Sequence, residues 1–220
     1  MVISYYGLSC FKIQSGDLTL ALDPPSKESD LKPPRFETHV VLSSHNHPSH
    51  NGLKELPGKK PDGPFLISGP GEYEVEGLSV IGIQSFHDSE RGKKLGSNTI
   101  YKIEMEDIKL CHLGDLGTAE VGPEVIEAIG EVDVLFVPMG GKDVLDPEGA
   151  VKIVQELEPK VVIPMHFAIA GTAIKGAKAE EFLKELGEEK IGAEEKFTFK
   201  KKDLPEEGTK VVLLKSMVSA

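Results

Sequence analysis

Three histidines stand within six residues, directly after a short apolar run. The segment 40–52 reads VVLSSHNHPSHNG and contains His45, His47 and His50. Residues i and i+2 of an extended backbone point to the same side, so His45 and His47 can bind one metal ion. A turn at Pro48 would bring His50 to a neighbouring position. One short segment cannot complete the coordination shell of a metal, so further ligands must come from distant parts of the chain, and this requirement constrains the fold.

Candidates for those ligands recur where other apolar, β-like runs end. They are His87 in QSFHD, Asp115 in CHLGD and His166 in VIPMHF. A single histidine at the end of a strand is more often a core or loop residue than a ligand. Here five of the chain's seven histidines are such candidates, and histidine is the commonest metal ligand among side chains. The five histidines and Asp115 are therefore candidate ligands of one metal site.

The pattern resembles that of the metallo-β-lactamase superfamily, whose signature is His-x-His-x-Asp-His followed by a distant His, a Gly-Asp pair and a final His. The resemblance covers nearly the whole chain. It implies an α+β fold, a four-layer αββα sandwich of the metallo-β-lactamase type, formed by a single domain over residues 1–220. The segment 69–75, GPGEYEV, is similar to a stretch of one branch, the family of the ascorbate-6-phosphate lactonase, and so favours a lactonase-like member.

Length and composition favour one soluble domain. With 220 residues, 39% of them hydrophobic, the chain can bury one sizeable core. It has two distant cysteines, no basic N-terminal leader and no apolar run of the ~18 residues that a membrane helix needs, so we expect a cytoplasmic protein without membrane contact. A net charge of −11 argues against nucleic-acid binding, and the resemblance implies a small-molecule substrate as the partner. Three Asn, three Gln and 28% charged residues favour a thermophilic source.

Hydrophobic periodicity predicts many short strands and a few helices. The expected strands are 3–6, 10–14, 18–23, 65–68, 73–75, 78–83, 98–104, 108–113, 132–138, 161–164, 196–199 and 210–214. The expected helices are 122–129, 147–157 and 179–186, with one helical turn at 52–56. Strand-rich and helix-bearing halves in this order fit two sheets packed face to face with helices outside.

The resemblance also implies a role for each candidate ligand. A first ion would be held by the imidazoles of His45, His47 and His87, and a second by those of His50 and His166. The Asp115 carboxylate would bridge both ions and belong to the catalytic centre. Zinc is the expected metal, with manganese or iron as alternatives. Because a catalytic zinc lowers the pKa of its water to about 7, the implied activity is that of a metal-dependent hydrolase acting on a small ester, lactone or phosphorylated substrate.

Three further residues are assigned to the site by resemblance. His112, three residues before Asp115, is similar to a histidine of lactonase-like members and would support the site or the substrate. Asp23 resembles the superfamily's aspartate behind the ligand histidines, although an aspartate before two prolines is also an ordinary turn residue. Lys142, in the loop 137–143, either meets an anionic group such as a sugar phosphate or is a solvated loop residue.

One position departs from the signature. Ser49 stands where the signature has Asp, and a neutral hydroxyl is a poor ligand for a hard divalent ion beside a carboxylate. The second site therefore loses one charge and one ligand, and we expect one bound ion rather than two. Three interpretations stay open: a one-metal hydrolase, a two-metal hydrolase with a loosely bound second ion, and a degenerate member that binds metal or ligand with little turnover.

Overall fold

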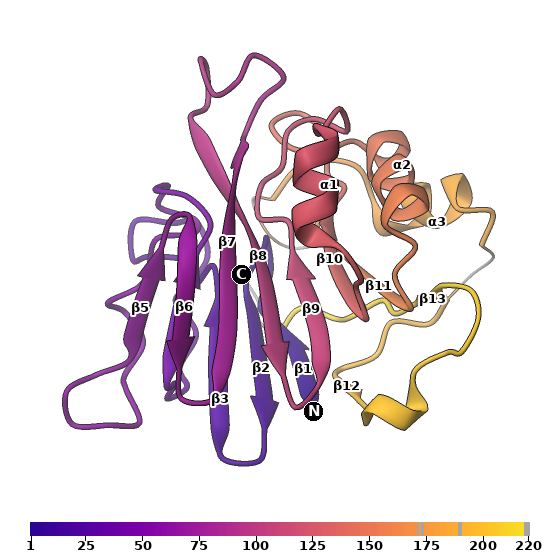
Figure 1. The fold of residues 1–220 in the computed structure, drawn as a ribbon. Coiled ribbons are helices and arrows are strands. Elements are labelled where there is room, and N and C mark those ends of the chain that lie inside the picture. The colour runs from indigo at the N-terminus through magenta and orange to yellow at the C-terminus, as the bar shows by residue number, and fades with distance from the viewer. Residues whose placement is uncertain (171, 173, 189–190, 218–220) are drawn as a thin grey trace.

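Two β-sheets packed face to face enclose the main core of the computed structural model, which describes residues 1–170, 172, 174–188 and 191–217 (Figure 1). The six-stranded sheet has the order β12-β1-β2-β3-β4-β5. Its strands are β1 (Val2–Tyr5), β2 (Phe11–Ser15), β3 (Leu18–Leu22), β4 (Val40–Ser43), β5 (Phe65–Ser68) and β12 (Phe197–Thr198).

The seven-stranded sheet has the order β13-β11-β10-β9-β8-β7-β6. Its strands are β6 (Gly71–Val75), β7 (Leu78–Phe86), β8 (Ser97–Met105), β9 (Ile108–His112), β10 (Val134–Pro138), β11 (Val161–Met165) and β13 (Lys210–Val211). The two sheets confirm the expected α+β sandwich.

Burial along the strands follows their position in the sheets. In β2, Phe11 and Ile13 are buried and alternate with partly exposed residues, as expected for a strand with one face toward the core. All residues of β10 and β11 are buried, because each strand has parallel neighbours and lies between the core and the helical layer.

Three α-helices lie on the side of the seven-stranded sheet: α1 (Pro123–Ile129), α2 (Pro147–Leu157) and α3 (Ala179–Glu185) (Figure 1). α1 contacts β7, α2 contacts β10, and α3 packs against α2. The α2 helix begins with Pro147, and the Asp146 carboxylate before it accepts a hydrogen bond from the Gly149 N–H at 2.8 Å. No helix in the described part of the chain is long and apolar enough to cross a membrane.

Loops rather than α-helices cover the other outer face in the residues that the structure describes. Ala21 and Val41 of the six-stranded sheet pack there with Leu56, Phe36 and Leu53 in a small separate cluster. The helical turn expected at 52–56 is one hydrogen-bonded turn, in which the Glu55 N–H donates to the Gly52 carbonyl at 3.0 Å. A short 3-10 helix, η1 (Lys201–Asp203), follows β12.

The carboxyl ends of several strands meet at one edge of the sandwich. β7 and β9 both run antiparallel to β8, so they point the same way, and β10 and β11 are parallel to β9. β4 of the other sheet ends beside them, because the Thr99 N–H of β8 donates to the Ser44 carbonyl at 2.8 Å. Side chains that follow β4, β7, β9 and β11 therefore gather at one place.

Candidate metal centre

Asp115, which follows β9, lies at the centre of a cluster of histidines. Its side chain is buried, and four imidazole Nε2 atoms face its two carboxylate oxygens. The distances are 3.2 Å to Oδ1 for His50, and 3.3, 3.4 and 3.8 Å to Oδ2 for His166, His87 and His45. The loops after β4, β7, β9 and β11 thus deliver their side chains to a single site.

Two overlapping sets of these atoms are compact enough to surround an ion. His45, His87 and Asp115 form one set, and His50, His166 and Asp115 form the other, with the ligand atoms of each set within 4.8 Å of one another. A third set, made of His45, His47 and His50, lacks Asp115. All three sets that the described residues form lie in this cluster.

The cluster has the donor chemistry that a divalent metal requires. The Nε2 atoms of His45 and His50 are buried and take part in no hydrogen bond of the described structure. A buried polar atom without a hydrogen-bond partner is costly, and coordination to a metal would satisfy such a nitrogen. Imidazoles with one carboxylate suit zinc, iron and manganese, so the residues present fit such an ion.

His47 lies at the edge of this arrangement. It is the exposed member of the histidine segment, and it is absent from both sets that contain Asp115. Its Nδ1 lies 2.5 Å from the Ser49 hydroxyl, which also lies 2.8 Å from Nδ1 of His50. Ser49 therefore contacts two of the histidine rings at their Nδ1 atoms, and among the interactions of the described residues it makes none with Asp115.

A buried chain of hydrogen bonds supports His45. The Ser44 hydroxyl lies 3.0 Å from Nδ1 of His45 and donates to Oδ2 of Asp23 at 2.7 Å. Asp23 also accepts the Ser44 backbone N–H at 2.6 Å, and Nε2 of His112 lies 2.7 Å from the same Oδ2. The structure thus places Asp23 directly behind a candidate ligand.

His112 lies in the core and not in the cleft. It is fully buried beside Phe11 and Phe136, with ring centroids 6.3 and 5.9 Å away. It can reach the metal centre only through Asp23 and Ser44, so its place in the structure is that of a supporting residue.

His166 is held by a tight backbone contact. Its φ is +58°, a left-handed conformation that is uncommon for residues other than glycine. Its N–H donates to the Leu8 carbonyl at 2.8 Å, and its own carbonyl lies 1.9 Å from the position that a Cβ on Gly140 would occupy. Glycine at 140 thus lets the loop after β10 approach His166 closely enough to fix its backbone.

Two buried residues that the sequence analysis missed hold Asp115. The Ser9 hydroxyl donates to Oδ1 of Asp115 at 2.8 Å, and the Asp115 N–H donates to the side-chain carbonyl of Asn98 at 3.0 Å. Ser9 lies between β1 and β2, and Asn98 lies in β8, so neither is close to Asp115 in sequence. Nothing in the local pattern around either residue distinguishes it from other polar residues.

Burial and the neighbouring charges shift the pKa values of the cluster. Burial alone would raise the pKa of Asp115, but His50 and His166 hold it well below its ordinary value of 3.8. Burial lowers the pKa of His45 to about 4, so His45 is neutral and able to bind metal near pH 7. Burial also disfavours protonation of His50 and His87, yet the Asp115 carboxylate outweighs it and raises the pKa of both above 6.5.

The cluster opens into a cleft of about 510 Å³. Leu8, Leu31 and Leu95 contribute apolar surface to it, and Lys142 and Lys175 contribute positive charge. The Lys142 side chain is 80% exposed and lies 3.7 Å from the Asp143 carboxylate. Lys142 is thus at the mouth of the cleft but makes no contact with the histidines among the interactions of the described residues.

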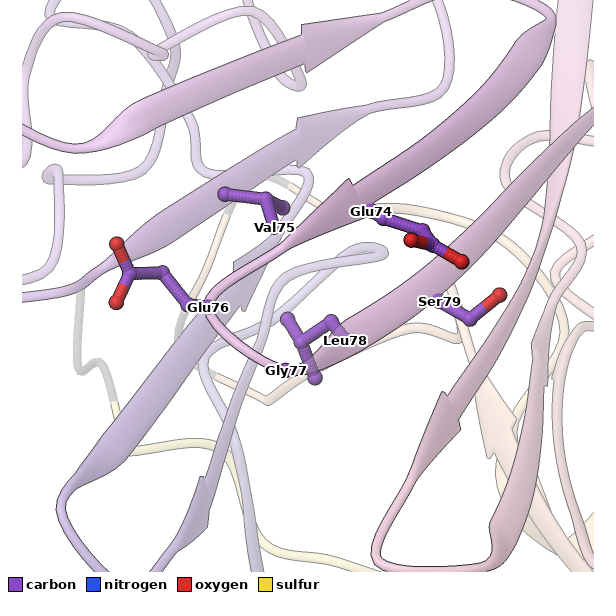
Figure 2. A pocket seen from close by; sticks show the side chains of 6 residues that line it. All are labelled: Glu74, Val75, Glu76, Gly77, Leu78 and Ser79. Atoms are coloured by element: carbon purple, nitrogen blue, oxygen red, sulfur yellow. The ribbon is translucent and has the colours of Figure 1, made fainter.

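A second hollow, shown in Figure 2, lies at the turn between β6 and β7. It has a volume of about 390 Å³ and is lined by residues 74–79 of this one hairpin. Glu74 and Glu76 lie apart from each other in it, and Glu76 is paired with Lys60. Because this hollow has no imidazole, the metal cluster and its cleft are the better candidate for a functional site.

Comparison with known proteins agrees with this geometry. A family model described as a β-lactamase superfamily domain matches residues 2–166. A metal-dependent hydrolase of Thermococcus onnurineus is 26% identical over 209 residues, which cover 84% of this chain and 92% of the relative. A metal-dependent hydrolase of Listeria monocytogenes is 27% identical over 197 residues, which cover 76% of this chain and 85% of the relative.

Among solved structures, a proposed Zn-dependent hydrolase of the metallo-β-lactamase superfamily from Thermotoga maritima is similar with a TM-score of 0.75. It is 30% identical, and the match covers 97% of this chain and 99% of that protein. The metallo-β-lactamase fold expected from the resemblance is thereby confirmed, with the α-helices of the described residues on one outer face of the sandwich rather than on both. With its two-sheet sandwich and a family model matched over residues 2–166, the chain belongs to the metallo-β-lactamase superfamily.

Proposed function

We propose that this protein is a zinc-dependent hydrolase that uses metal-activated water on a small ester, lactone or phosphorylated substrate. The observation that carries the proposal is the convergence of four imidazole Nε2 atoms on Asp115, within 3.2 to 3.8 Å, two of which are buried and make no hydrogen bond in the described structure. The names of the relatives, metal-dependent hydrolase and Zn-dependent hydrolase, support the same reaction class.

The residues of the cluster have different roles in this proposal. His45, His50, His87, His166 and Asp115 would hold the metal. When bound, a zinc ion supplies hydroxide near neutral pH and polarises the bond to be cleaved. Asp115 provides the negative charge of the site, because its depressed pKa keeps it ionised throughout the physiological range. Ser9 orients this carboxylate by donating to Oδ1.

Charge favours one ion over two. Asp115 is the one carboxylate in the candidate sets, and Ser49 adds no charge where the superfamily signature has Asp. Two divalent cations sharing one carboxylate would repel each other with little compensation. We therefore propose that the protein binds close to one ion per chain.

The proposal also covers the substrate, the branch of the superfamily and the cellular location of the protein. Lys142 and Lys175 line the cleft together with Glu28, Asp30 and Asp143, so an anionic group of the substrate, such as that of a phosphorylated or carboxylated lactone, would bind at the two lysines. The segment 69–75 and His112, each similar to a feature of lactonase-like members, favour the lactonase-like branch. Both cysteines, Cys10 and Cys111, are free and buried, which suits the reducing cytoplasm. A melting temperature above the mesophilic range would support a thermophilic source.

Metal analysis is the decisive test of metal binding. Protein purified without added ions should contain about one zinc per chain, and anomalous scattering should locate it beside Asp115. His87→Gln should lose most of the metal, whereas His39→Gln should keep it, because His39 lies outside the cluster. A wild-type protein that takes up no divalent metal even after reconstitution would contradict the proposal.

Measuring turnover distinguishes the hydrolase from the alternative function, a metal- or ligand-binding protein with little activity. The Ser at position 49, where the signature has Asp, favours this alternative. A panel of lactones, phosphodiesters and thioesters should include a substrate whose hydrolysis stops with a chelator and returns with zinc. Hydrolysis that survives complete metal removal would overturn the mechanism. Metal binding without turnover of any member of the panel would select the alternative.

A further inference from the structure

The position of His47 differs from that of the four histidines that face Asp115. Its ring is exposed to the cleft, and its Nδ1 is occupied by contacts with Ser49. The Ser49 backbone N–H points at this Nδ1 from 3.4 Å, and the Ser49 hydroxyl lies 2.5 Å from it. Two separate groups of Ser49 thus converge on one nitrogen.

Proton accounting assigns a direction to each of these contacts. A ring nitrogen that accepts from a backbone N–H carries no proton, so the Ser49 hydroxyl must also donate to Nδ1 of His47. The hydroxyl has a single proton, so it accepts at its oxygen from Nδ1 of His50, 2.8 Å away. Once His50 is neutral it has a bare Nε2 toward Asp115, which is the form of a metal ligand, and neutral His47 carries its proton on Nε2.

The hydroxyl has a consequence that a carboxylate would not have. An ionised Asp side chain at position 49 could only accept hydrogen bonds, so the backbone N–H at 3.4 Å would be the one donor of residue 49 left to compete with a metal for the Nδ1 lone pair of His47. Ser49 instead supplies a proton to that lone pair. Ser49 therefore changes what the neighbouring histidine can do, besides removing a charge.

We propose that His47 is not a metal ligand in this chain but a hydrogen-bond donor to the substrate, and that Ser49 is the positioning residue that fixes its tautomer. The Nε2–H of an exposed ring at the cleft wall suits an acceptor oxygen, either the carbonyl of an ester or lactone or a phosphoryl oxygen. This inference rests on the proposed function, because it assumes a metal on the remaining histidines.

Nuclear magnetic resonance of the wild-type protein tests the tautomer directly. In a long-range ¹H–¹⁵N correlation spectrum at alkaline pH, His47 should show protonated Nε2 and unprotonated Nδ1, and zinc should leave its Nδ1 signal in place. His39 is a matched control, because its Nδ1 accepts the Thr19 N–H at 3.1 Å far from the cluster. Movement of the His47 Nδ1 signal to the metal-bound position on addition of zinc would overturn the proposal.

A double-mutant cycle on metal affinity tests the role of Ser49. In zinc titrations of metal-free protein, His47→Gln should change zinc affinity by less than about threefold, whereas His87→Gln should lower it by more than about 100-fold. Loss of a residue that only hydrogen-bonds to a metal ligand already lowers metal affinity about 10- to 100-fold. In the Ser49→Asp background, where no hydroxyl donates to Nδ1, His47→Gln should lower zinc affinity at least about tenfold. Equal losses for His47→Gln and His87→Gln in the wild-type background would show that His47 is a ligand.

Kinetics test the contact with substrate. With p-nitrophenyl acetate, γ-butyrolactone or bis(p-nitrophenyl) phosphate, whichever the zinc-loaded protein hydrolyses, His47→Ala should lower kcat/KM about tenfold at unchanged metal content. His47→Gln should recover part of this loss, because its amide is also a donor. Wild-type rates in the Ala variant would overturn the substrate contact. A wild-type protein that binds no zinc would instead contradict the proposed function, so the two failures are distinguishable.

Discussion

Asp23 accepts the hydrogen bonds that hold the candidate ligand His45 in place. Its carboxylate accepts three hydrogen bonds: the Ser44 N–H at 2.6 Å, the Ser44 O–H at 2.7 Å, and the His112 Nε2–H at 2.7 Å. If Nε2 of His45 binds metal, its Nδ1 must carry a proton and donate to Ser44. Asp23 therefore determines, through one hydroxyl, which nitrogen of His45 is available to a metal.

Asp23→Asn tests this role. The amide has one accepting oxygen and presents an NH₂ group to donors, so at least one buried hydrogen bond is lost and the free energy of unfolding should fall by about 1–3 kcal/mol. Zinc affinity should fall by about 10- to 100-fold, because the partner of His45 is disturbed. Calorimetric unfolding and zinc titration measure the two effects.

Asp133→Asn provides the control for Asp23→Asn. Asp133 is buried and accepts from the Lys109 N–H at 2.9 Å and from Lys160 at 2.8 Å, but it lies away from the cluster. The control should lose stability and keep its zinc affinity. If both variants bind zinc as the wild type does, Asp23 is a structural residue without influence on the metal centre.

At the scale of elements, the ends of β10 and β11 fix the geometry of the site. The two strands are parallel and paired from Val134 with Val161 to Pro138 with Met165, so the loops that follow them emerge side by side. Gly140 and His166 meet in these loops. The left-handed backbone of His166 is maintained because nothing larger than hydrogen stands at position 140.

Gly140→Ala should therefore disturb the metal centre from outside it. The added Cβ would lie 1.9 Å from the His166 carbonyl, so the backbone must move, which should cost about 1–3 kcal/mol of stability and lower zinc affinity. Gly192→Ala is the matched control, since a Cβ there meets nothing within 4 Å. Equal melting temperatures and zinc affinities for the two variants would exclude this contact as a determinant of the site.

At the scale of the molecule, metal binding, protonation and folding are linked. The pKa values of His50 and His87 lie above 6.5 in the folded, metal-free protein because Asp115 faces them. A raised folded-state pKa stabilises the fold below the unfolded-state value of 6.5, and this contribution is lost as pH rises through the folded-state pKa. His45, with its pKa of about 4, is already neutral in this range.

The stability of the two forms should therefore diverge as the pH rises above about 6.5. Metal-free protein should become less stable as pH rises. Zinc should stabilise the protein more at higher pH, because fewer protons compete with it for His50 and His87. Each proton that zinc displaces changes the zinc affinity about tenfold per pH unit. Melting temperatures with zinc and with a chelator, measured across this range, check the prediction. A zinc-induced increase that does not vary with pH would show that these histidines are not ligands.

The sequence by itself determined the local structure and the chemical class of the site. Period-two patterns and continuous apolar runs identified most strands, and the helix expected at 147–157 has the same bounds in the structure. These features depend on neighbouring residues and on the burial of one face, so they can be inferred from a short window. The histidines and Asp115 could be grouped because few residue types bind metals and because each follows a strand-like run.

Tertiary structure alone decided how those residues are used. Ser9 reaches Asp115 across 106 positions, and His112 reaches Asp23 across 89, through contacts between different strands that no local pattern encodes. Sequence could identify Ser49 as a departure from the signature but could not show that its hydroxyl lies between the rings of His47 and His50. Hydrogen-bond direction depends on positions within a few tenths of an ångström, and these are fixed only when the strand ends pack together.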